Sequence, residues 1–178
     1  MDSSNQIERR AVAVSFDAAR PRTLFGYAAV FGQTANIGGF DEVIEAGAFR
    51  RSLASGKDIL CQVDHDSSAV LGRTSSGTLR LTEDSRGLRF ELDVPETTKG
   101  RDIVELAKRG DLGGMSFGFF VPEGGEKWEG NTRILSDVEL VEISVVQSFP
   151  AYSGTSVDVR SKVAMPRLNA LRETLRYV

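Results

Sequence analysis

A serine with a glycine two residues before it and another two residues after it is the strongest sign of chemistry in this chain. The segment is Gly114-Met115-Ser116-Phe117-Gly118, a G-x-S-x-G pattern. In an extended strand, side chains alternate between faces, so Ser116 would share one face with both glycines while apolar side chains anchor the other. An uncovered hydroxyl can be approached by a base and a substrate together, as a nucleophile requires. A serine that fills space at a glycine-rich bend is the alternative.

The chain contains one histidine, His65, which is therefore the only candidate base for a serine nucleophile. It ends the short apolar run 58–65, which predicts a strand. By alternation, Asp64 and Asp66 would point to the opposite face, so neither is expected to orient the imidazole. A structural or simply exposed histidine is the alternative interpretation.

A carboxylate to orient His65 is predicted in the segment 138–147, whose valines and isoleucines indicate a strand. Glu139 and Glu142 have opposite parity in it. Glu139 shares its face with the more uniformly apolar set, where an unpaired carboxylate would be costly or forced neutral. Glu142 is therefore the better partner for His65, Glu139 remains the alternative, and a solvent-facing glutamate is the third interpretation.

Four other chemistries fit these residues less well. An α/β-hydrolase would place the acid and the histidine after the serine, whereas His65 precedes Ser116. Cys61 lies on the same predicted strand as His65, roughly 13 Å away, too far to be activated by it. A metal site at 64–66 lacks further histidine or cysteine ligands, and the glycines at 110–114 lack the lysine of a phosphate-binding loop. No cofactor is expected.

Composition narrows the classes of partner. The chain of 178 residues has 25 acidic and 22 basic side chains, so neither nucleic acid nor an anionic membrane is implied as a partner. A single cysteine excludes an internal disulfide and suits a reducing cytoplasm. No apolar run approaches the roughly 20 residues that span a bilayer, and the first residues lack the apolar core of a secretory signal. A soluble, intracellular protein is expected.

The elements that must position these residues are mostly strands, in one domain. Two helices are also predicted, at 46–54 and at 102–109, the latter with a threonine hydroxyl as N-cap and Gly110 as its end. The pattern up to residue 94 indicates an antiparallel meander. A domain over 1–160 is expected, followed by a basic amphipathic helix or tail at 161–178 that docks on the domain or binds a partner, and the chain end suggests a truncated or processed form. The predicted strands are 11–16, 23–31, 40–44, 58–65, 72–74, 78–81, 88–94, the Ser116 segment, 138–147 and 156–159.

Several segments together resemble the prohead maturation proteases of tailed bacteriophages, serine peptidases distantly related to herpesvirus assemblin. They occur in the expected order and cover most of residues 24–157. One small departure is Glu45-Ala46-Gly47, where a proline is expected before the glycine. The segments that carry the resemblance are 26–32, 45–49, 64–66 with 71–74, 109–119, and 142–146 leading to 150–152.

The resemblance implies a mainly β fold with flanking helices (α+β), a compact, largely antiparallel β-barrel of the assemblin type. His65 and Ser116 would lie on neighbouring strands as catalytic residues. The third group in assemblin relatives is a histidine, which this chain cannot supply, so Glu142 in the matching strand would replace it. Backbone N–H groups of Gly113 and Gly114, or of a loop elsewhere, would bind the oxyanion.

The resemblance also implies a serine endopeptidase that cleaves the scaffolding portion of the major capsid protein, and itself, during procapsid maturation. Its partners would be the major capsid protein with its scaffolding segment and further copies of itself, including a homo-oligomer, with no nucleic acid or membrane. It would act in the host cell cytoplasm, inside the assembling procapsid. The competing class is a non-enzymatic capsid-assembly or scaffold-like binding module, in which the tail helix binds a partner and Ser116 is structural.

Overall fold

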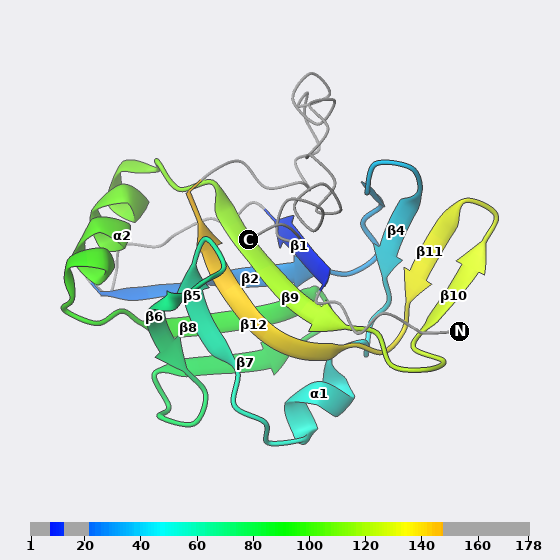
Figure 1. Cartoon of the computed structure of the whole chain (residues 1–178), viewed down its shortest axis with the longest axis horizontal. Coiled ribbons are helices and arrows are strands. Elements are labelled where there is room, and N and C mark those ends of the chain that lie inside the picture. The colour runs from blue at the N-terminus through cyan, green and yellow to red at the C-terminus, as the bar shows by residue number, and fades with distance from the viewer. Residues whose placement is uncertain (1–7, 13–21, 148–178) are drawn as a thin grey trace, which may run out of the picture.

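The computed structural model describes residues 8–12 and 22–147, and this part of the chain is mainly β with two short helices (Figure 1). The mainly β class with flanking helices is therefore confirmed. The predicted strand at 156–159, the helix or tail at 161–178 and the proposed boundary at residue 160 lie outside the described residues. So do residues 13–16 of the first predicted strand.

One sheet of five strands contains Ser116 and Glu142, and the turn between two of its strands contains His65. Its central strand β12 lies between β9, which carries Ser116, and β5, which leads to His65. The expectation that His65 and Ser116 lie on neighbouring strands is therefore wrong, because β12 separates the two strands. Neighbouring strands are antiparallel except for β12 and β5, which are parallel. In spatial order the strands are β1 (Glu8–Val12), β9 (Gly114–Phe120), β12 (Glu139–Val146), β5 (Leu60–Val63) and β6 (Asp66–Arg73).

Two smaller sheets complete the β-structure. One has three antiparallel strands, in the order β2 (Thr23–Val30), β8 (Gly87–Asp93) and β7 (Leu79–Glu83). The other has four, in the order β10 (Glu126–Glu129), β11 (Thr132–Leu135), β4 (Asp41–Ile44) and β3 (Ala35–Asn36), with β11 and β4 parallel.

The expected closed barrel is not found among the described strands, which form three separate sheets. The predicted antiparallel meander holds only for single hairpins: β3 pairs with β4, β5 with β6 and β7 with β8, but these three pairs belong to three different sheets. The pair β5 and β6 joins the late strand β12, about 80 positions further on by the register of Ser144 with Gln62. Strands β10 and β11 were not predicted, since β10 is short, charged and largely exposed.

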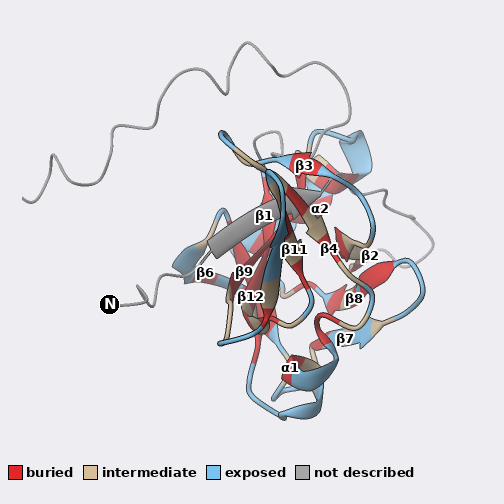
Figure 2. Cartoon of the chain, turned by 90° about the vertical axis from the view of Figure 1, so that its right-hand side faces the viewer, coloured by how far each residue is buried: buried red, intermediate tan, exposed pale blue. Residues whose placement is uncertain are grey.

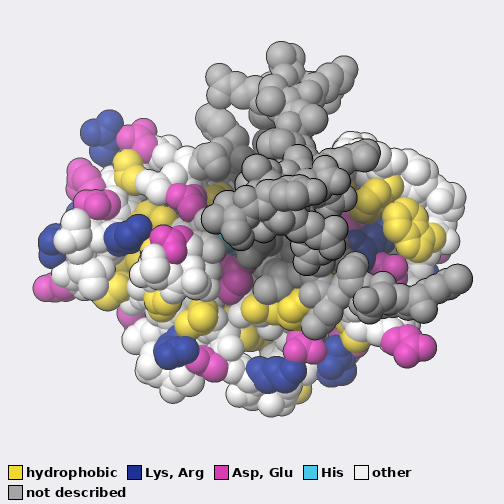
Figure 3. Space-filling view, in the orientation of Figure 1, with side chains coloured by type: hydrophobic (Ala, Val, Ile, Leu, Met, Phe, Trp, Pro, Cys, Tyr) yellow, Lys and Arg dark blue, Asp and Glu magenta, His cyan; other side chains and the backbone are white. Residues whose placement is uncertain are grey.

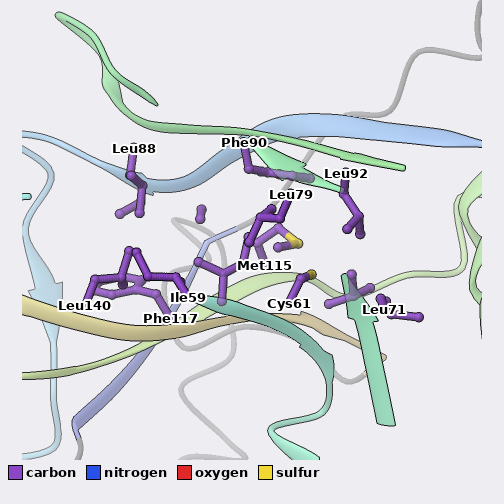
Figure 4. Packing of buried hydrophobic residues seen from close by; sticks show 14 of the residues in the cluster. Ile59, Cys61, Leu71, Leu79, Leu88, Phe90, Leu92, Met115, Phe117 and Leu140 are labelled. Carbon is purple, nitrogen blue, oxygen red and sulfur yellow. The ribbon is translucent and has the colours of Figure 1, made fainter. Parts of the chain in front are cut away.

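The core lies between the five-stranded and the three-stranded sheets (Figure 4). Met115 and Phe117 from β9 face Leu88 and Phe90 from β8, and all four side chains are fully buried. Burial of this apolar area, at about 25 cal/mol per Å², holds β9 with its opposite face toward the candidate site. Buried residues concentrate along these strands, whereas α1 is largely exposed (Figure 2).

The two helices flank the sheets. Helix α2 (Thr98–Arg109) begins four residues before the predicted range 102–109 but has the predicted threonine cap, since Thr97 Oγ1 accepts a hydrogen bond from Gly100 N at 3.1 Å. It ends at Gly110, whose φ of 75° is left-handed. Helix α1 (Arg50–Ala54) is shorter than predicted because Gly47, with φ of 99°, belongs to the preceding turn. Neither of these described helices is long and apolar enough to cross a membrane.

Charged side chains of both signs are interspersed over the described surface that faces the viewer in Figure 3. Many are paired, as Arg80 is with Glu91 and Asp93. The arrangement agrees with the near balance of 25 acidic and 22 basic residues and creates no single-sign field on that part of the surface.

Candidate active site

His65 lies in a two-residue turn and not at the end of a strand. Strand β5 ends at Val63, β6 begins at Asp66, and these two residues are paired. Asp64 and His65 have φ of 48° and 62°, the positive values that a type I′ hairpin turn requires at both central residues. The predicted strand 58–65 was therefore too long, because the turn lacks the glycine that usually signals this geometry. Aspartate and histidine are among the few side chains that adopt it.

The turn is tied to the end of β12 by several hydrogen bonds. Asp64 N donates to Val145 O at 2.9 Å, and the Asp64 carboxylate accepts from Gln147 N at 2.9 Å and from Gln147 Nε2 at 2.6 Å. His65 N donates to Ser144 Oγ at 3.2 Å. Left-handed backbone at a residue other than glycine costs on the order of 1–3 kcal/mol and is held in place by surrounding contacts. These hydrogen bonds therefore fix the backbone position from which the His65 side chain extends.

The imidazole of His65 meets the carboxylate of Glu142. His65 Nδ1 lies 2.7 Å from Glu142 Oε1, and the two side chains are 21% and 5% exposed. Ser144 Oγ donates to the other oxygen, Glu142 Oε2, at 2.7 Å. A proton on Nδ1, donated to Glu142, leaves Nε2 as the basic nitrogen. The expected pairing of His65 with Glu142 is thus seen as a direct contact.

Glu139 faces a different partner. Its carboxylate pairs with Lys57 Nζ, and this hydrogen bond lowers the pKa of Glu139. The predicted alternation along β12 fails near Val141, where the pairing of Leu140 with Phe119 is followed by that of Glu142 with Gly118. This irregularity inserts one residue and reverses the parity. Glu139 is consequently outside the apolar core in which the sequence pattern had placed it.

Ser116 lies in the middle of β9, directly opposite Ser144 of β12. Met115 and Phe117 are fully buried in the core, so the predicted strand and its two-faced pattern are confirmed. Directly opposite residues of an antiparallel pair have Cβ atoms about 4.5–5.5 Å apart on the same face. Ser116, itself 2% exposed, therefore neighbours the serine that contacts both His65 and Glu142. Gly118 is opposite Glu142, and its missing side chain leaves room for the carboxylate.

The remaining candidates take other places. Cys61 points into the core, away from this face, and burial raises the pKa of its thiol far above the ordinary value. Asp66 accepts hydrogen bonds from Ser68, which lower its pKa. Gly113 N is already bound to Val146 O at 2.9 Å. Over residues 8–12 and 22–147, no group of three or more histidine, cysteine, aspartate or glutamate side chains is arranged to hold a metal.

The sequence analysis missed three residues of this network: Asp64, Ser144 and Gln147. Ser144 could have been found, because it lies two positions after Glu142 and so shares its face in a regular strand. Asp64 was placed on the wrong element, since the turn was not recognised. Nothing local marks Gln147, whose role depends on the turn to which it binds.

Comparison with known proteins gives one family and one fold. The profile of the caudovirus prohead serine protease family matches residues 6–168. Among solved structures, the chain is similar to the bacteriophage T4 capsid assembly protease, gp21, with a TM-score of 0.57. The match covers 79% of this chain and 97% of that chain at 8% identity, so it shows a shared fold alone. No curated protein sequence matches significantly.

Proposed function

The chain belongs to the caudovirus prohead serine protease family, whose members act in capsid maturation, and we propose that it cleaves the scaffolding portion of the major capsid protein and itself. The observation that carries this proposal is the 2.7 Å contact of His65 Nδ1 with Glu142 Oε1 on the sheet face that also bears Ser116. Family membership supports a serine-type peptidase, and this contact supplies the activated base that such a peptidase needs.

In the proposed mechanism, His65 Nε2 removes the proton of Ser116 as Oγ attacks the scissile carbonyl. Glu142 keeps the other imidazole proton on Nδ1 and stabilises the imidazolium. Collapse of the tetrahedral intermediate returns the proton from Nε2 to the leaving amine. Water then repeats the sequence on the acyl enzyme and regenerates Ser116.

The oxyanion needs backbone N–H donors. The N–H of Gly113 is engaged with Val146 O, which leaves Gly114 or another loop as the source.

The proposal includes where and on what the enzyme acts. Its substrates are the major capsid protein with its scaffolding segment, and the chain itself, inside the assembling procapsid in the host cell. Residues 1–160 would form the protease domain and 161–178 a tail, and copies of the chain would associate as a homo-oligomer.

The experiment is co-expression of the full chain with its capsid precursor, with cleavage followed by mass spectrometry. Ser116→Ala is expected to abolish processing with the fold intact. Ser85→Ala, at an exposed serine remote in sequence from the site, serves as the matched control and should process normally. Undiminished cleavage by Ser116→Ala would remove Ser116 from the mechanism.

A serine-directed fluorophosphonate probe separates the enzyme from a non-enzymatic scaffold-like module. Labelling that requires both Ser116 and His65 is expected for the enzyme. A lack of labelling in the free chain and in every assembly state would favour the binding module instead.

A further inference from the structure

Ser144 occupies a central place on the catalytic face. It is fully buried in β12, with Ser116 of β9 opposite on one side and Gln62 of β5 opposite on the other. Its hydroxyl oxygen lies 3.2 Å from His65 N and 2.7 Å from Glu142 Oε2. One hydroxyl thus joins the backbone of the residue that would act as base to the carboxylate that would orient it.

The chemistry of the groups sets the direction of each hydrogen bond. A backbone N–H can only donate, an ionised carboxylate can only accept, and a hydroxyl has one proton to give. The order must therefore run from His65 N–H to Ser144 Oγ, and from the Ser144 hydroxyl to Glu142 Oε2. With His65 Nδ1 facing Glu142 Oε1 at 2.7 Å, the contacts close a ring through His65, Ser144 and Glu142.

We propose that Ser144 is a positioning residue, which holds the Glu142 carboxylate so that Oε1 faces His65 Nδ1. The terminal torsion of a glutamate is broad and poorly restricted by its own covalent structure, so a hydrogen bond from Ser144 to Oε2 favours one rotation of the carboxylate. The same hydroxyl also anchors the left-handed backbone of His65, with φ of 62°. Ser144 acts through these two residues and does not itself touch the substrate.

The consequence for catalysis rests on the proposed function, because the imidazole tautomer matters only if His65 activates Ser116. The positioning of Glu142 by Ser144 does not depend on the proposed protease function. It can be measured on the folded chain without a substrate, so the two can fail independently.

The test uses the single histidine of the chain. Nitrogen-15 labelling of histidine in the full chain gives one imidazole, whose NMR signals report the tautomer without ambiguity. The wild type is expected to carry its proton on Nδ1. Ser144→Ala is expected to shift the tautomer balance toward Nε2 and to make exchange of the Nδ1 proton with water at least about tenfold faster.

Ser52→Ala is the matched control. Ser52 is also a buried serine, and its Oγ accepts from a backbone N–H of the same strand, Leu140 N, at 2.9 Å. The control therefore loses a comparable hydrogen bond to β12 without touching His65 or Glu142. Its imidazole signals should match those of the wild type. Ser144→Cys, which keeps nearly the same volume and substitutes a weak donor, is expected to give an intermediate shift and provides a second variant if Ser144→Ala fails to fold.

Measurement of cleavage activity tests the consequence of the Ser144 substitution for catalysis. Loss of a hydrogen bond to a charged group predicts a fall in kcat of about tenfold or more for Ser144→Ala, with KM nearly unchanged. Unchanged imidazole signals in Ser144→Ala and Ser144→Cys would overturn the proposal, as would an equal change in Ser52→Ala. If Ser144→Ala shifts the tautomer but the wild-type chain itself cleaves no substrate, the positioning role of Ser144 is upheld and the proposed protease function is refuted.

Discussion

Replacing Glu142 by glutamine tests the proposed triad most directly, because the surrounding hydrogen bonds dictate how the new amide must lie. The hydroxyl proton of Ser144 needs an acceptor, which is now Glu142 Oε2 at 2.7 Å. In Glu142→Gln the amide oxygen must take that place. The amide nitrogen, which can only donate, then faces His65 Nδ1 where Oε1 now lies at 2.7 Å.

This arrangement reverses the imidazole tautomer. Nδ1 must accept, the proton moves to Nε2, and Nε2 can no longer remove the proton of Ser116. A wrong tautomer in a serine protease triad lowers kcat about 10⁴-fold, which corresponds to ~5 kcal/mol of transition-state stabilisation at about 1.36 kcal/mol per factor of ten. The two side chains are nearly the same size, so the melting temperature should change little.

The assay is the rate of capsid-precursor cleavage by the full chain, with thermal unfolding measured alongside. Glu139→Gln is the matched control in the same strand. Its pairing with Lys57 is solvent-accessible, with side chains 34% and 61% exposed, and pairs of this kind contribute about 0–1 kcal/mol. Activity within about twofold of wild type is expected for the control. Glu142→Gln activity within tenfold of wild type, with the protein folded, would refute the assigned role of Glu142.

Three further predictions concern stability. Phe117→Ala removes a fully buried ring packed against two other phenylalanines and should lower the free energy of unfolding in urea by about 3–5 kcal/mol. Gly110→Ala should cost about 1 kcal/mol in the same assay, since its left-handed φ of 75° disfavours any side chain although the space around it is open; no loss would contradict the cap. The hydrogen bond from Tyr27 is the main cause that lowers the pKa of Asp84. The Asp84 carboxylate therefore binds a proton less readily in the folded chain than in the unfolded chain. Its contribution to the free energy of unfolding is complete above about pH 4 and is lost as the pH falls further. Asp84→Asn should flatten the dependence of the melting temperature on pH below about pH 4, and an unchanged slope would exclude this contribution.

Local patterns were sufficient to predict the strand around Ser116. Its side chains alternate strictly, and the buried face of Met115 and Phe117 requires the opposite face to carry Gly114, Ser116 and Gly118. Helix α2 was predicted from the threonine cap and the terminal glycine for a similar reason, since capping depends on residues within one turn. The family resemblance, which rested on the order of short segments, is confirmed by the match over residues 6–168.

Non-local pairing could not be predicted in this way. The parallel neighbours β5 and β12 are joined by register partners such as Gln62 and Ser144, which nothing in either segment specifies. For the same reason the expected barrel was wrong and the meander held only for single hairpins. The irregularity at Val141 reverses the parity of β12, and only the pairing with β9 shows that it places Glu139 beside Lys57 instead of in the core.

The amino-acid sequence by itself determined the chemical groups available: one histidine, one glycine-flanked serine on a strand with a bare face, and a glutamate two residues before a second serine. Tertiary structure alone decided which of them meet. The imidazole is turned toward β12 by the positive φ of Asp64 and His65 and by the hydrogen bonds between Asp64 and Gln147. The register of β12 with β9 brings Ser144 opposite Ser116. Contacts between residues far apart in the chain depend on how whole strands pair, and this pairing is set by burial of both sheets together and not by any local pattern.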